Sequence, residues 1–110
     1  SISDARRLMG PMRIVGATSH SIAEARAAVK AGADYISVGP MFPTPLKPGL
    51  KAGGFHYLAA AKRLGVPHFC IGGITPERAS RSMGRVAVCS GVIGTRDVAR
   101  AARAILGRIS

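Results

Sequence analysis

HFCIGGITP (residues 68–76) is an apolar run that ends in two glycines, an isoleucine and a threonine–proline pair. Residues 68–71 suit a short strand buried in a sheet. Gly72 and Gly73 carry no side chain, so a ligand can approach the backbone closely at the end of that strand. Thr75 and Pro76 are typical of the N-cap and first position of a helix. The stretch therefore predicts a strand, an open turn and a helix, in that order.

Similar units flank this stretch. Short apolar strands are expected over residues 13–17, 35–39 and 86–89, and helices over residues 21–31, 55–64 and 95–109. Ser21 and Glu24 have the spacing of a capping box, and Gly32 and Gly65 are suited to end helices. A further short helix is expected near residues 4–9. Four strand–helix repeats in one domain, residues 1–110, predict an α/β fold with a parallel sheet.

Two architectures use this alternation, the open doubly wound sheet and the closed barrel. No Gly-x-Gly-x-x-Gly motif opens the first unit. Glycines instead follow the third and fourth strands, where a (β/α)₈ TIM barrel binds phosphate if these are its strands seven and eight. The pattern favours the C-terminal half of such a barrel. Half a barrel leaves two unpaired edges, so we expect the chain to be a fragment, to self-associate or to pair with another half.

The chain carries a net charge of +11, and 47% of its residues are hydrophobic. Twelve of its sixteen basic residues are arginine. Nucleic-acid binding is the first class that such a charge suggests. The arginines are dispersed, however, and the last segment places Arg96, Arg100 and Arg103 on one helix face. We interpret them as solvated, and a positive field also attracts anionic ligands. No segment approaches the length of a membrane span, and neither cysteine, Cys70 or Cys89, has metal-ligand spacing, as expected for a cytoplasmic protein with reduced, buried thiols.

Small and hydroxylated residues cluster where the strands end. Gly73 follows the third strand, Cys89 and Ser90 follow the fourth, and Thr18 follows the first. Thr44 and Lys47 stand in a loop that its prolines stiffen. Backbone N–H groups, hydroxyls and an ammonium group there predict a phosphate site. The plainer interpretations are tight turns, helix caps and a solvated lysine.

The motifs in their order resemble the thiamine phosphate synthase family, with thiazole tautomerase as a close relative. They are IVG with HS in residues 14–21, GADY in 32–35, VGPMFPT in 38–44 with Lys47, IGGIT in 71–75 and VAVCS in 86–90. The resemblance implies a transferase that joins hydroxymethylpyrimidine diphosphate to thiazole phosphate, and that uses Mg²⁺ on the diphosphate. The partners it implies are small phosphorylated substrates, with no nucleic acid and no membrane.

The resemblance also implies residue roles. Lys47, as the catalytic residue, and Thr18 would contact the pyrimidine diphosphate. The thiazole phosphate would lie at Thr44, Pro45, Leu46, Gly73, Cys89 and Ser90. Leu46 stands where the family commonly has a second threonine, and Thr18 where it has a serine. The family's two Mg²⁺-binding aspartates belong to its first four strands and have no counterpart here, so no metal ligand is assigned to this chain.

The sequence leaves three functions open. The first is the synthase, which would need its other half. The second is a thiazole tautomerase, an isomerase that would use the same phosphate site without Mg²⁺ and for which His20 and the stretch at residues 47–50 are candidates. The third is a phosphate-binding remnant without catalysis.

Overall fold

The computed structural model describes residues 1–44, 49 and 51–110. Within these residues, four strands form one parallel sheet in the order β1-β2-β3-β4. The elements follow one another as α1 (Ile2–Met9), β1 (Gly16–Ser19), α2 (Ile22–Lys30), β2 (Tyr35–Val38), α3 (Gly54–Lys62), β3 (His68–Ile71), the 3₁₀ helix η1 (Arg81–Met83), β4 (Val86–Ala87), α4 (Ser90–Ile93) and α5 (Val98–Ile109). The predicted α/β class with parallel strand–helix repeats is confirmed.

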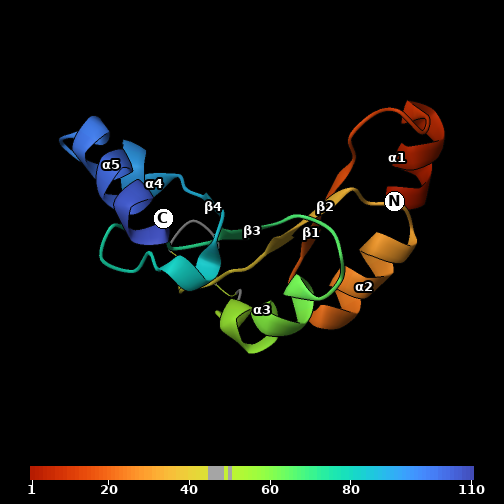
Figure 1. Cartoon of the computed structure of the whole chain (residues 1–110), viewed down its shortest axis with the longest axis horizontal. Helices are drawn as coiled ribbons and strands as arrows, with labels where there is room; N and C mark the ends of the chain where they lie inside the picture. The colour runs from red at the N-terminus through yellow and green to blue at the C-terminus, as the bar shows by residue number, and fades with distance from the viewer. Residues whose placement is uncertain (45–48, 50) are drawn as a thin grey trace.

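Helices α2 and α3 cover one face of the sheet, the lower face in Figure 1. The core lies between them and the strands. Ile36, Val38 and Cys70 of the sheet are fully buried, as are Ala25 of α2 and Ala61 of α3. The small alanines allow the helices to lie close to the strands.

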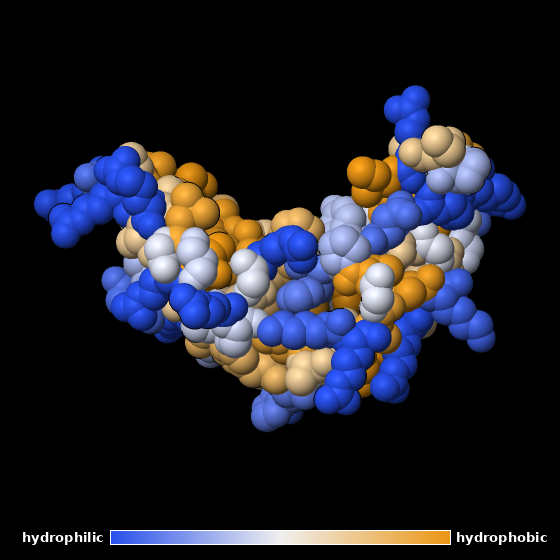
Figure 2. Space-filling model, viewed as in Figure 1, coloured by the Kyte–Doolittle hydropathy of each residue, from blue (hydrophilic) through white to orange (hydrophobic). Residues whose placement is uncertain are grey.

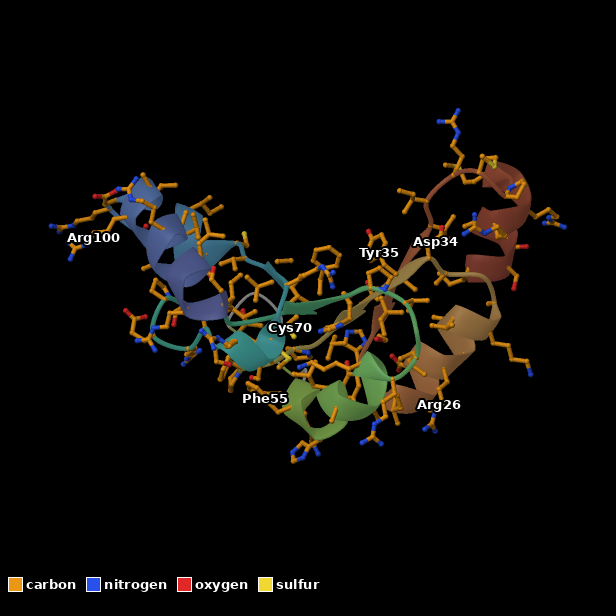
Figure 3. The ribbon with its side chains drawn as sticks, in the orientation of Figure 1. Arg26, Asp34, Tyr35, Phe55, Cys70 and Arg100 are labelled. Carbon is orange, nitrogen blue, oxygen red and sulfur yellow. The ribbon has the colours of Figure 1, made fainter. Side chains whose placement is uncertain are left out.

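The opposite face of the sheet is open. Figure 3 shows Tyr35 on the side of the sheet away from Phe55 of α3. Tyr35 and Phe69 pack edge to face with ring centroids 5.6 Å apart, while Ile71 is 41% exposed and Ile14 76% exposed. The molecule is hollowed above this face (Figure 2). In the part of the chain that the structure describes, no element covers it.

The segment after Gly73 differs from the sequence prediction. Instead of a helix from Thr75, residues 76–78 form a turn and Arg81–Met83 form η1. The Thr75 carbonyl accepts from the N–H groups of Arg78 and Ala79, so a single helical turn forms. The hydroxyl groups of Ser80 and Ser82, 2.9 Å apart, hydrogen-bond to each other, and short polar side chains of this kind favour turns over helix interiors.

The end of the chain also differs in detail from the expected single helix over residues 95–109. Ser90 already begins the four-residue helix α4, and Asp97 caps α5 by accepting from the Arg100 N–H at 2.9 Å. Ala101 and Ile105 of α5 are buried. Arg100 (Figure 3) and Arg103 are exposed, as predicted for a solvated arginine face. No described helix combines the length and the apolar character needed to cross a membrane.

Helix α1 buries no side chain fully and is held mainly by Arg6. The Arg6 guanidinium donates to the carbonyls of Gly32, Gly10 and Arg13, at 2.7–3.1 Å, and pairs with the Asp34 carboxylate. Asp34 also accepts from the N–H of Val15 at 2.8 Å. These contacts tie α1 to the start of β1 and β2. The Val15 N–H, and then Arg6, lower the pKa of Asp34 below its usual 3.8.

Replacement of Asp34 tests this junction through its pH dependence. A carboxyl group whose pKa is lowered by folding contributes stability above its unfolded pKa, and that contribution is lost as the pH falls through the folded pKa. We expect Asp34→Ala to be less stable than the unchanged chain in urea unfolding at pH 7. The difference should shrink steadily below pH 3.8. A difference of the same size at pH 7 and pH 2 would contradict this role.

Candidate functional site

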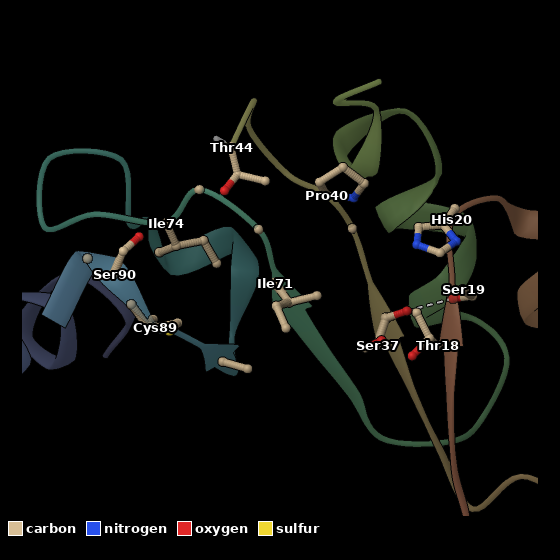
Figure 4. Close-up of a pocket in the computed structure, with 16 residues that line it drawn as sticks. Thr18, Ser19, His20, Ser37, Pro40, Thr44, Ile71, Ile74, Cys89 and Ser90 are labelled. Atoms are coloured by element: carbon tan, nitrogen blue, oxygen red, sulfur yellow. Dashed lines mark hydrogen bonds between the residues drawn. The ribbon is translucent and has the colours of Figure 1, made fainter. Parts of the chain in front are cut away.

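A cavity of about 270 Å³ lies at the carboxyl ends of the four strands, within the described residues. Its lining includes Thr18, Thr44, Gly73, Cys89 and Ser90. Figure 4 shows Thr44 and Ser90 on one side of it and Thr18, Ser37 and His20 on the other. Five site residues predicted from three separate strand ends and one loop therefore meet in one place, because parallel strands all end at the same edge of a sheet.

The wall at the end of β1 is held by hydrogen bonds. Ser19 is fully buried and its hydroxyl donates to the Ser37 carbonyl at 2.7 Å, while the neighbouring Thr18 is exposed toward the cavity. His20 lies beside Glu24, with 3.4 Å between Nδ1 and Oε2. The Glu24 carboxylate accepts from the N–H of His20 at 2.7 Å, rather than from that of Ser21 as an ideal capping box requires.

The glycines after β3 form the floor of the cavity against the loop that follows β2. Gly73 has φ +64°, and a Cβ atom there would lie 2.7 Å from the Pro43 carbonyl oxygen and 2.9 Å from the Phe42 Cβ. The two segments run together, since Met41 N–H donates to the Ile71 carbonyl at 3.0 Å and Phe42 N–H to the Gly72 carbonyl at 3.1 Å. Glycine is thus required at position 73 both by backbone conformation and by space.

The turn from β4 into α4 packs against the same floor. Cys89 is the N-cap of α4 and Ser90 its first residue. A Cβ atom on Gly91 would lie 2.1 Å from the Ile74 carbonyl oxygen. The first N–H groups of a helix have no acceptor within that helix. The turn therefore places Ser90 in the lining of the same cavity as Gly73.

Tyr57 links the two remaining strand ends, and the sequence did not single it out. Its buried hydroxyl donates to the Ser19 carbonyl at 2.6 Å and accepts from the Gly39 N–H at 3.0 Å. Burial raises the pKa of this phenol above 10.0, so it keeps its proton. The available signal was a tyrosine beside the apolar run Leu58–Ala61 of α3, because a buried tyrosine hydroxyl needs a partner.

Three predicted site residues cannot be placed, and one cysteine differs from its expected burial. Pro45, Leu46 and Lys47 are outside the residues that the structure describes. Cys89 is exposed, contrary to the expectation that both thiols are buried. Cys70 is buried as expected, and burial raises its pKa to about 11, so it is an inert thiol of the core.

The described cavity lining holds hydroxyls, amides and His20 but no carboxylate. Among the residues that the structure describes, no cluster of three or more His, Cys, Asp or Glu side chains could hold a metal ion. These residues therefore do not fit a Mg²⁺ site. The arrangement instead suits the binding of a phosphate group through backbone N–H groups and hydroxyls.

The family model for thiamine monophosphate synthase matches residues 1–94. This chain belongs to the thiamine monophosphate synthase family. The family was expected from the order of its motifs, and that resemblance is confirmed.

Relatives of this family member show how much of the protein the chain spans. It is 39% identical to the thiamine-phosphate synthase of Mycolicibacterium vanbaalenii, over 96% of the chain and 50% of that protein. It is 40% identical to the thiamine-phosphate synthase of a Synechococcus species, over 96% of the chain and 31% of that protein. The solved thiamine phosphate pyrophosphorylase of Pyrococcus furiosus matches 97% of the chain with a TM-score of 0.82 and 32% identity, and the match covers 53% of that structure.

Proposed function

We propose that this chain supplies the thiazole-phosphate-binding half of a thiamine phosphate synthase. The reaction would join hydroxymethylpyrimidine diphosphate to thiazole phosphate and release pyrophosphate. The observation that carries the proposal is the meeting of Thr44, Gly73 and Ser90 in one cavity at adjacent strand ends. Family membership supplies the substrate class, and the cavity supplies donors for a phosphate group.

Within this proposal the residues have separate tasks. Gly73, Cys89 and Ser90 bind the thiazole phosphate, together with Thr44, Pro45 and Leu46. Thr18 and Lys47 contact the diphosphate. The carbon–oxygen bond to the diphosphate breaks, the leaving group carries the electron pair away, and the thiazole nitrogen attacks the pyrimidine cation. Such a reaction depends on alignment of the two substrates and on donors that face the leaving group.

The open face of the sheet supports a further part of the proposal. Four strands with one bare apolar face fit half of a (β/α)₈ barrel, in which that face becomes the packed interior. The exposed Tyr35 and Ile71 would then be covered by the four remaining strands. Self-association is the alternative way to cover them.

The cytoplasmic location of the protein stays a prediction.

Magnesium belongs to the proposal only through the family. It would neutralise charge on the diphosphate, but none of the described residues forms a site for it. Any ligands would have to come from the other half of the barrel, and no step of the reaction is assigned to a metal held by this chain.

A thiazole tautomerase is the second candidate, because His20 lines the cavity beside Glu24. An imidazole at this position is a suitable acid or base for moving a proton on a bound thiazole. A tautomerase would isomerise thiazole phosphate without releasing pyrophosphate. Assays of these two products separate the candidates. A phosphate-binding remnant would bind thiazole phosphate and turn over neither substrate.

Complementation tests the synthase proposal. The chain is mixed or co-expressed with the part of the Mycolicibacterium vanbaalenii synthase that lies outside the matched region. We expect pyrophosphate and thiamine phosphate to form in equal amounts only when both parts and Mg²⁺ are present. Lys47→Ala in this chain should lower the rate by roughly a hundredfold, because a positive charge that would stabilise the departing diphosphate is lost. Isomerised thiazole without pyrophosphate, or binding alone, would contradict the synthase proposal.

A further inference from the structure

Arg78 lies outside the cavity yet contacts both loops that form its floor. Its guanidinium Nη1 donates to the Gly73 carbonyl at 3.0 Å. The guanidinium carbon also lies over the Phe42 ring, 5.2 Å from the centroid, at the distance of a cation–π contact. One exposed side chain therefore joins the glycine turn after β3 to the loop after β2.

Phe42 is itself held from the other side. Its ring packs edge to face against Phe55 of α3, with centroids 5.5 Å apart, and its N–H donates to the Gly72 carbonyl at 3.1 Å. The loop that leads to Thr44 is thus fixed between α3 and Arg78. A shift of the Phe42 ring would move this loop against Gly73, where a single methyl group has no room.

The Gly73 carbonyl belongs to the same peptide unit as the N–H of Ile74. The peptide group is planar and trans, so fixing the oxygen also fixes the direction of that N–H. Ile74 and Gly73 both line the cavity. Gly73 is also a residue with a wide choice of backbone conformations, so a contact that fixes its carbonyl has a large effect on where the neighbouring N–H groups point.

We propose that Arg78 is a positioning residue for the phosphate site, which acts through the Gly73 carbonyl and the Phe42 ring and does not touch the ligand. The inference rests on the proposed thiazole phosphate site and adds to it. Removal of Arg78 frees the Gly73 peptide and the loop after β2. The consequence is weaker phosphate binding in a protein that still folds, because the side chain is exposed.

The chain offers a matched control. Arg81 lies three residues further on, is also exposed, and donates from Nε to the main-chain oxygen of Ser110 at 3.0 Å. Arg81→Ala removes the same charge and a similar hydrogen bond, but not near the cavity. Arg78→Lys keeps the charge and loses the planar group that both hydrogen-bonds and stacks. Together with Arg78→Ala, these two variants separate positioning of the site from the effect of the general positive field.

The test is calorimetric titration of the 110-residue chain and its variants with thiazole phosphate. Arg78→Ala is expected to raise the dissociation constant about tenfold, the scale of one lost cation–π contact and one hydrogen bond. Arg78→Lys should recover only part of this loss, and Arg81→Ala should bind as the unchanged chain does. Equal weakening by Arg78→Ala and Arg81→Ala, or full recovery by lysine, would overturn the inference in favour of long-range charge.

A second readout needs no ligand. The amide resonance of Ile74 should shift in Arg78→Ala and in Arg78→Lys but not in Arg81→Ala, and an unchanged resonance would overturn the inference. Should Arg78→Ala not fold, Arg78→Lys carries the test. If the unchanged chain binds no thiazole phosphate, the proposed site fails and the inference fails with it. If it binds and Arg78→Ala binds equally well, the inference alone fails.

Discussion

Gly91→Ala is expected to lower the free energy of unfolding by about 3 kcal/mol, the upper part of the range for forcing an extra methyl group into a packed interior. The added Cβ would lie 2.1 Å from the Ile74 carbonyl oxygen and 3.1 Å from a methyl carbon of Val88. The first of these neighbours is backbone and cannot rotate away. The β4–α4 turn must therefore move off the glycine turn, and thiazole phosphate binding should be lost with it.

Gly107→Ala is the matched control for this substitution. Gly107 lies inside α5, and a Cβ atom there would have no neighbour within 4 Å. Alanine in a helix interior is favoured over glycine by about 1 kcal/mol, so this variant should be more stable than the unchanged chain. Urea unfolding of both variants measures the two changes. A Gly91→Ala protein as stable as the unchanged chain would show that the two turns are not in contact.

Tyr57→Phe is expected to cost about 2 kcal/mol of unfolding free energy, because it leaves a buried carbonyl and a buried N–H without their partner. The ring is kept, so the loss isolates the hydroxyl that joins Ser19 to Gly39. The ends of β1 and β2 should also separate, which would weaken ligand binding on the Thr18 side of the cavity.

Tyr35→Phe removes the same hydroxyl group from a tyrosine on the open face of the sheet. Tyr35 is 36% exposed and packs on Phe69 through its ring. Exposed substitutions of this kind change stability by about 0.5 kcal/mol or less. Thermal and urea unfolding of the two variants should therefore differ clearly, and equal losses would argue against a bridging role for Tyr57.

The parallel sheet could be predicted from local patterns in the sequence. Short apolar runs between capped helices, such as the helix that begins after Ser21, define strand–helix repeats without any knowledge of distant contacts. The segment after Gly73 misled the prediction, because Thr75 and Pro76 are good helix-starting residues at a place where Ser80 and Ser82 favour turns. A cap signal fixes where a helix can begin but not that one continues.

The meeting of Thr18, Gly73 and Ser90 was predictable because strand ends of a parallel sheet share one edge. The contacts that hold these residues in place were not predictable. The Tyr57 hydroxyl reaches Ser19, 38 positions earlier in the chain, and Arg78 reaches the Phe42 ring in another loop. Contacts of this range depend on the packing of whole elements, so no local pattern reports them.

An amide-resolved NMR titration with thiazole phosphate tests most directly whether the neighbouring ends of β3 and β4 form one phosphate site. We predict that the amides of Gly73, Ser90 and Gly91 shift together and saturate at the same ligand concentration, while those of Arg100 and Arg103 on the outer helix stay in place. Shifts of Gly73 and Ser90 that saturate at different concentrations, or a response confined to the arginine face of α5, would contradict the claim.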